Sequence, residues 1–204
     1  MEGFYTVQTE ARWEQTVNKS RFIALICPAA NQVDCEEALT KIRLQYPNAR
    51  HYVYAYRLFE GRLEKASDDG EPQGTGGRPL LDVLQHRLVW NIILVVVRYF
   101  GGILLGTGGL TRAYGGTARR LLEETNLTLL QRHACFNLVI PYSHFERLKY
   151  EFGLRNWQVS EPEFNAEIKM TVFLPTPEEN DFNDWLDEQM GRQVRWQKTG
   201  EIWR

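Results

Sequence analysis

The chain has 204 residues, of which 43% are hydrophobic and 12% aromatic, so it is long enough for one large or two small packed domains and disorder is not expected. Its formal net charge of −2 excludes a polycation that would bind nucleic acid through total charge alone. No run approaches the roughly 20 apolar residues that a membrane-spanning helix needs, and the first residues do not resemble a signal peptide, so the sequence predicts a cytoplasmic protein without membrane partners.

The first 60 residues predict strands on either side of one helix. Apolar runs at residues 4–7 and 21–27 predict two strands, and Pro28 ends the second. Asn31 is the expected N-cap of a helix whose apolar residues recur at helical spacing until Pro47. Residues 51–59, which are rich in Tyr and Val, predict a further strand.

A polar loop with several glycines follows, from Ser67 to Gly77, before a helix that is expected to start near Pro79. The loop carries three carboxylates within four residues, Asp68, Asp69 and Glu71. They could bind magnesium or orient a water molecule, whereas a solvated Asp-Gly turn is the simpler interpretation. No metal site is predicted, because the three cysteines and four histidines lack ligand spacing.

The next segment combines a buried strand with a second group of glycines. The uninterrupted apolar run from Ile92 to Val97 predicts a strand covered on both faces. A helix with Thr107 as its candidate N-cap is expected after it. Eleven of the 16 glycines lie between Gly70 and Gly116, although a glycine inside a helix or strand costs about 0.5–1 kcal/mol. Either backbone geometry or a ligand must explain them.

Charge favours a ligand for the second group of glycines. Residues 83–122 contain no Asp or Glu but five arginines. The free N–H groups and the dipole at the start of a helix attract anions, and arginine binds phosphate with two hydrogen bonds. The spacing matches neither a P-loop nor a dinucleotide fingerprint, since there is no lysine before Thr107 and no glycine at Thr111. The predicted phosphate- or nucleic-acid-binding residues are Arg98, Gly101, Gly102, Gly106, Thr107, Gly108, Gly109, Arg112, Arg119 and Arg120.

The remainder of the chain starts a new pattern. A strand at 134–140, a helix at 142–152, strands near 157–160 and 166–174, a helix at 178–190 and a strand near 194–196 give the order β-α-β-β-α-β, which is typical of a ferredoxin-like domain. We therefore expect a mixed α+β protein with an N-terminal two-layer α/β domain, residues 1–131, and a C-terminal ferredoxin-like domain, residues 132–204.

Three motifs taken together closely resemble the IMPACT family in its bacterial, YigZ-like branch. They are Lys19-Ser20-Arg21-Phe22, the loop from Ser67 to Gly77, and the segment from Val97 to Leu110. The resemblance implies that the first domain is similar to the second domain of ribosomal protein S five and to domain four of elongation factor G. It implies that the second is similar to the last, ferredoxin-like domain of that factor. Eukaryotic relatives act in translational control by competing for the activator of a starvation-sensing kinase.

We therefore favour a non-catalytic binding protein that acts in translation and contacts RNA or the ribosome, with no cofactor and no catalytic residue. One alternative is an enzyme that binds a nucleotide or another phosphorylated small molecule at the same glycine loops, with Arg98 holding phosphate and an acidic-loop carboxylate as base or magnesium ligand. Another is an adaptor for a translation-related protein partner, in which the tryptophans of the second domain contact the partner. If the acidic and basic glycine segments pair with each other, their role is structural.

Overall fold

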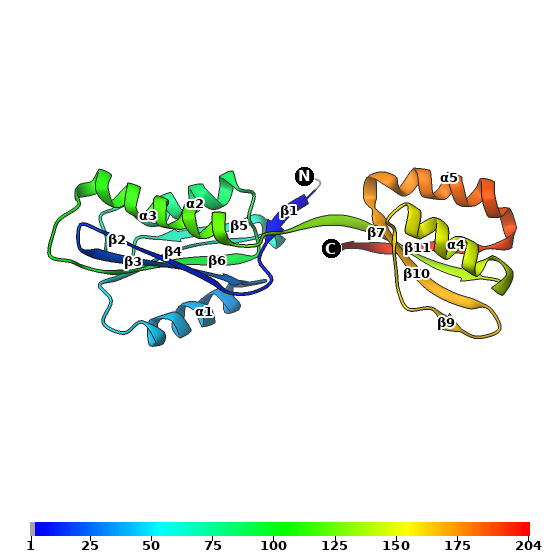
Figure 1. Cartoon of the computed structure of the whole chain (residues 1–204), viewed down its shortest axis with the longest axis horizontal. Helices are drawn as coiled ribbons and strands as arrows, with labels where there is room; N and C mark the ends of the chain where they lie inside the picture. The colour runs from blue at the N-terminus through cyan, green and yellow to red at the C-terminus, as the bar shows by residue number, and fades with distance from the viewer. Residues whose placement is uncertain (1–2) are drawn as a thin grey trace. The chain divides into compact units, whose positions relative to one another are not determined.

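The computed structural model describes residues 3–204, and the chain divides into two compact units (Figure 1). The first comprises Phe4–Leu129, and the second is built from Leu130–Arg204. Both combine helices with an antiparallel sheet, so the protein has the predicted α+β class. Within the described residues, no helix has the length and apolar character that crossing a membrane requires.

The first unit is organised around its central strand. All the neighbouring strands in its sheet pair antiparallel, in the order β2-β3-β6-β4-β5. Residues 92–98 are buried, which confirms the prediction of a strand covered on both faces. The strands are β2 (Ala11–Val17), β3 (Ser20–Pro28), β4 (His51–Leu58), β5 (Leu63–Ser67) and β6 (Ile92–Tyr99), and the short β1 (Gly3–Thr6) bridges to Val89 through Tyr5.

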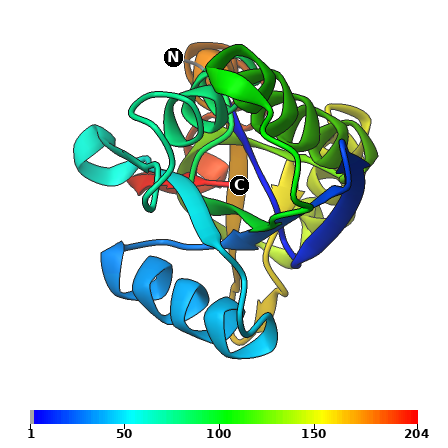
Figure 2. The same cartoon turned by 90° about the vertical axis from the view of Figure 1, so that its left-hand side faces the viewer.

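Helices cover both faces of this sheet (Figure 2). On one face, α2 (Gly77–His86) and α3 (Gly106–Glu124) pack on a core that includes Phe22 and Val96. On the other, α1 (Gln32–Gln45) packs on a core that includes Val95. Because successive strand residues point to opposite faces, the apolar run of β6 supplies both cores. The sheet with α2 and α3 forms the two layers that the family resemblance implies, and α1 adds a layer behind them.

Of the two predicted helix N-caps, one is confirmed and the other is not. Asn31 is the N-cap of α1, as predicted: its side chain accepts a hydrogen bond from Asp34 N–H at 3.0 Å, and the Asp34 carboxylate accepts one from Asn31 N–H. The prediction that Thr107 caps α3 is wrong. This helix begins at Gly106, its N-cap is Leu105, and no side chain caps it.

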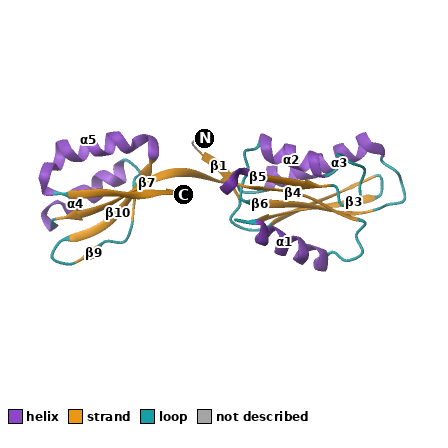
Figure 3. Ribbon diagram, turned by 180° about the vertical axis from the view of Figure 1, so that it is seen from behind, coloured by secondary structure: helices purple, strands orange, loops and turns teal. Residues whose placement is uncertain are grey.

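The second unit has the predicted ferredoxin-like order. Its main strands lie in the order β11-β7-β10-β8, and α4 and α5 pack on one face of the sheet around Phe136, Phe152 and Phe182 (Figure 3). The elements are β7 (Thr128–Ile140), α4 (Tyr142–Leu154), β8 (Gln158–Val159), β9 (Glu163–Phe164), β10 (Ile168–Pro175), α5 (Glu179–Met190) and β11 (Arg195–Trp203).

Candidate functional site

The acidic loop between β5 and α2 is held together by Asp68. One carboxylate oxygen accepts hydrogen bonds from Gly76 N–H and Gly77 N–H at 2.9 and 2.8 Å, and the other accepts one from Gly74 N–H at 2.8 Å. Burial acts to raise the pKa of Asp68, but the three N–H donors lower it, and the net pKa lies below its ordinary value. The carboxylate therefore satisfies free N–H groups at the start of α2.

The neighbouring carboxylate of Asp69 has other partners. It accepts a hydrogen bond from Tyr52 N–H at 2.6 Å and forms an ion pair with Arg43 at 2.9 Å. The carbonyl oxygen of Asp69 lies 2.8 Å from Nδ1 of His51. Asp69 thus fastens the loop to the start of β4 and to α1. Over the described part of the chain, no group of three or more His, Cys, Asp or Glu side chains is arranged to hold a metal ion.

Glu71 is buried and connects the acidic loop with the basic segment. Its Oε1 lies 2.5 Å from Arg98 Nη1 at the end of β6, and it accepts a hydrogen bond from the Tyr114 hydroxyl of α3 at 2.7 Å. His51 Nε2 lies 3.7 Å from the same oxygen. The side chains of Glu71 and Arg98 are only 4% and 6% exposed. Arg98 is therefore not on the surface with the other predicted phosphate-binding arginines, because its guanidinium neutralises a buried carboxylate.

Backbone geometry in the loop between β6 and α3, and in the first turn of α3, explains why several of the predicted site residues are glycine. A Cβ on Gly101 would lie 2.0 Å from the carbonyl carbon of Lys19, and Gly101 N–H donates to the hydroxyl of Ser20. Gly102 and Gly106 have positive φ angles of 83° and 67°. At Gly109 a Cβ would crowd Leu105 at 3.1 Å. Thr107 and Gly108 lie exposed in the uncapped first turn of α3.

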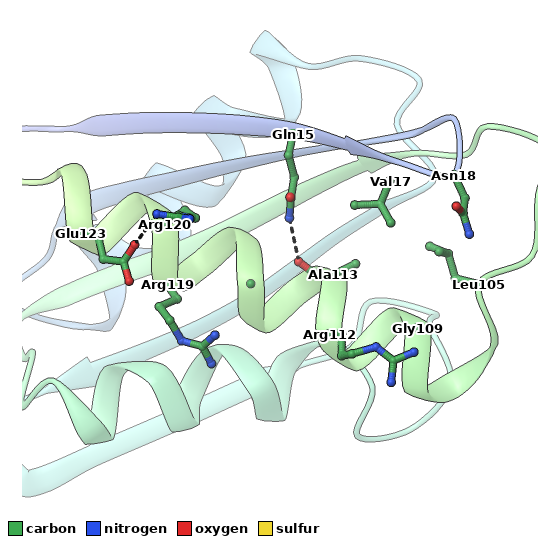
Figure 4. Close-up of a pocket in the computed structure, with 11 residues that line it drawn as sticks. Gln15, Val17, Asn18, Leu105, Gly109, Arg112, Ala113, Arg119, Arg120 and Glu123 are labelled. Atoms are coloured by element: carbon green, nitrogen blue, oxygen red, sulfur yellow. Dashed lines mark hydrogen bonds and ion pairs between the residues drawn. The ribbon is translucent and has the colours of Figure 1, made fainter.

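Two grooves run along α3, one on each side. The first, of about 630 Å³, lies between β2 and α3, and three arginines and one glutamate line it (Figure 4). The second, of about 690 Å³, lies between α2 and α3. Arg112 and Arg119 line both grooves, whereas Arg120 lines only the first and Arg87 only the second. We call the part of α3 between the grooves that is formed by Arg112, Gly116 and Arg119, which line both grooves, the α3 ridge.

The positive charge of the α3 ridge is not neutralised within the unit. Arg120 forms an ion pair with Glu123 at 3.1 Å, and Arg78 pairs with Asp82 at 2.7 Å. Among the residues that the structure describes, neither Arg112 nor Arg119 has an ion-pair or hydrogen-bond partner. Both side chains are exposed. An anion that approached α3 would therefore meet two free guanidinium groups.

The structure adds residues to this surface that the sequence did not indicate. Gln15 and Asn18 line the first groove, and Gln15 Nε2 donates to the Thr117 hydroxyl at 2.7 Å, which joins β2 to α3. No sequence signal pointed to them, because β2 was not predicted. The hydrogen bond from Tyr114 to Glu71 had no local sequence signal either, because it joins residues far apart in the chain.

The buried thiols of the first unit are poorly suited to nucleophilic chemistry. Burial raises the pKa of Cys27 to about 11 and that of Cys35 to about 12. Both therefore stay protonated at neutral pH, where the nucleophilic form of a thiol is its thiolate.

Comparison with known proteins gives matches over both units. The family model of the Impact N-terminal domain matches residues 18–122, and that of a domain of unknown function, DUF1949, matches residues 138–191. The IMPACT family member YvyE of Bacillus subtilis is 31% identical over 92% of this chain and 87% of its own. Protein IMPACT of Mus musculus is 34% identical over 55% of this chain and 36% of its own. A crystal structure of a hypothetical protein superposes with a TM-score of 0.62 at 28% identity, covering 96% of this chain and 97% of the other.

The role of Asp68 can be tested by Asp68→Asn, which introduces an amide where three N–H groups need acceptors. We expect a loss of about 1–3 kcal/mol of stability at pH 7. Since the folded-state pKa is lowered, the contribution of Asp68 is complete above the unfolded pKa of about 3.9 and is lost as the pH falls through the folded value. The stability difference from wild type should therefore shrink below about pH 4.

Native-state hydrogen exchange of the β6 amides measures this stability within the first unit. Glu36→Gln on α1 is the matched control, because its exposed carboxylate has no partner among the described residues. A stability difference for Asp68→Asn that stays constant from pH 7 to pH 3 would contradict the assigned role.

Gly101 can be tested by Gly101→Ala, whose new methyl group would collide with the backbone of Lys19. We expect a loss of at least about 2 kcal/mol in the exchange free energy of the β6 amides. The control is Gly116→Ala in α3 of the same unit, where a Cβ would meet only Gln15 Nε2 at 3.9 Å, and it should leave the exchange free energy of the β6 amides unchanged or raise it by up to about 1 kcal/mol. Equal stabilities of Gly101→Ala and wild type would show that the loop does not need this close approach.

Proposed function

The chain belongs to the IMPACT family, and on that premise we propose that it is a non-catalytic binding protein of translation that contacts RNA, free or within the ribosome, through the α3 ridge. The observation that carries the proposal is the pair of exposed, unpaired arginines, Arg112 and Arg119, which line the grooves on both sides of α3. The relatives reported above carry the family name, and the RNA ligand is our own inference from the charge.

The spacing of the two arginines suits a polyphosphate. They are seven residues apart on one helix, which places them on the same face and about 10.5 Å apart along the axis. Each guanidinium can bind a phosphate through two parallel hydrogen bonds. RNA presents phosphates repeatedly along its backbone, so it can occupy both side chains at once.

The groups that would serve an enzyme at this place have other partners, which supports binding over catalysis. Asp68 is bound by backbone N–H groups, Asp69 pairs with Arg43, and Glu71 is buried against Arg98. In the enzymatic alternative, Arg98 would hold phosphate and one of these carboxylates would act as base. Both roles would require the buried pair or the loop to open.

The tryptophans of the second unit give less support to the adaptor alternative. Trp157 is buried, and its Nε1 donates to the Glu178 carboxylate at 2.6 Å. Trp185 and Trp196 pack against the same core. These side chains contribute apolar area to the fold, so less of it is available to a protein partner.

Charge reversal at the ridge tests the proposal. For the double variant Arg112→Glu/Arg119→Glu we expect a large loss of affinity for ribosomal RNA, with the slope of log affinity against log salt reduced by about one per phosphate contact removed. Fluorescence anisotropy at several salt concentrations measures both quantities. The control is Arg50→Glu/Lys65→Glu, which changes the net charge equally at exposed side chains that line neither groove and have no ion-pair partner among the described residues.

Two results would count against the function. One is wild-type protein that neither binds RNA nor sediments with ribosomes at low ionic strength. The other is a ridge variant that binds as tightly as the control.

A further inference from the structure

From the two grooves and the charges along them we infer that the RNA bound by the α3 ridge is double-helical, and that α3 lies along the shallow minor groove of an A-form duplex. This inference rests on the proposed function and specifies its ligand. Three features of the surface carry it: the side chains that line the grooves, the placement of charge on the two flanks, and the low profile of the ridge.

The lining side chains suit a ligand whose bases are hidden. Single-stranded RNA is recognised mainly by stacking its bases on aromatic rings, whereas duplex RNA is recognised by its phosphates, its 2′-hydroxyls and its shape. Among the described residues that line the two grooves, none is Phe, Tyr or Trp. They offer instead guanidinium groups and neutral polar groups, including the amide of Asn18 and the hydroxyl of Thr111. The two carboxylates of the lining, Asp82 and Glu123, are each paired with an arginine.

Positive charge lies on both flanks of the helix as well as on its crest. Arg112 and Arg119 reach both grooves, and Arg87 adds a positive charge on the α2 side. Arg120 lines only the β2 side, where it pairs with Glu123. A convex ridge with positive charge on each flank matches a groove bordered by two rows of phosphates. A single strand has one row of phosphates and would engage one flank at a time.

The ridge is low because glycine lies between the two arginines. A Cβ at Gly116 would meet only Gln15 Nε2, at 3.9 Å, so the packing of the unit leaves room for a side chain there. Gly116 has no positive φ that would require glycine, and helix interiors disfavour this residue. Its effect on the surface is to let a broad ligand approach the α3 backbone between Arg112 and Arg119.

Groove dimensions select the form of the duplex. An α-helix with its side chains is about 10–12 Å across, too broad for the minor groove of B-form DNA, which is about 6 Å wide. The minor groove of A-form RNA is wide and shallow, and its 2′-hydroxyls lie at the surface. Polar groups of the lining, such as the Asn18 amide, are suited to contact these hydroxyls.

The test measures binding of the full chain to three labelled ligands at one salt concentration: a duplex RNA of about 16 base pairs, one strand of it, and a DNA duplex of the same sequence. We expect the RNA duplex to bind about tenfold more tightly than the other two, because only it presents 2′-hydroxyls beside two rows of phosphates. If the single strand or the DNA duplex binds equally well, the inference fails while the proposed function stands. If no RNA binds, ribosomal RNA included, both fail.

A glycine variant tests the close approach. Gly116→Gln places an uncharged side chain on the ridge, and we expect the affinity for duplex RNA to fall about tenfold while the β6 amides exchange as slowly as in wild type or more slowly. Gly153→Gln, at a helical glycine of the second unit with open space around it, is the control and should bind as wild type. Duplex binding by Gly116→Gln at wild-type affinity would overturn the inference.

A third variant separates stacking from groove binding. Phe100 is the exposed aromatic residue of the loop that precedes α3, with 47% of its surface accessible to solvent. Phe100→Ala should leave duplex binding unchanged. The Phe100 ring lies under the guanidinium of Arg98, with Cζ 5.6 Å from the ring centroid, so hydrogen exchange of the β6 amides is measured as well. A loss of duplex affinity as large as that of Arg112→Glu/Arg119→Glu, with exchange as in wild type, would show that bases stack on this ring, and would overturn the duplex assignment.

Discussion

A carboxylate and a guanidinium buried at the end of the central strand connect the parts of the first unit that its surface depends on. Glu71 comes from the loop before α2, Arg98 from β6 and Tyr114 from α3, and all three meet at one carboxylate oxygen. Removing one partner of such a pair leaves an uncompensated buried charge, which costs about 3–5 kcal/mol. Together with the apolar core on which α3 packs, the hydrogen bond of Tyr114 to Glu71 fixes α3 against the sheet, and this positions the exposed arginines of α3.

The glycine-rich region is one segment in the sequence, but in the structure its residues have two different roles. Arg98 belongs to the interior, whereas Arg112 and Arg119 belong to the surface. Several glycines next to these arginines serve the fold, as at Gly101, where two backbones touch. Gly116 is different, since its neighbours would tolerate a side chain. Burial and backbone geometry together separate the residues that build the unit from those that remain for a ligand.

Much of the fold could be predicted because its signals are local. The β6 run, the Asn31 cap and the order of elements in the second unit each depend on residues close in sequence. The strands β2 and β5 were missed because they lie at the edges of the sheet, where their half-exposed, polar sequences lack an apolar run. The interior position of Arg98 does have a local signal, because the residue continues the alternation of Leu94 and Val96 on a strand that is covered on both faces. Its partner Glu71 could not be identified from local patterns, since 27 residues separate the two.

Burial also determines how the two kinds of charge respond to ions in solution. The Debye length is about 8 Å at physiological ionic strength, and screening acts on exposed charges far more than on buried ones. The guanidinium groups of Arg112 and Arg119 are therefore open to competing counterions, while the contact between Glu71 and Arg98 is sheltered from them. A rise in ionic strength would release an anionic partner from α3 but leave the buried Glu71–Arg98 pair intact. Association could therefore be reversed without any unfolding of the protein.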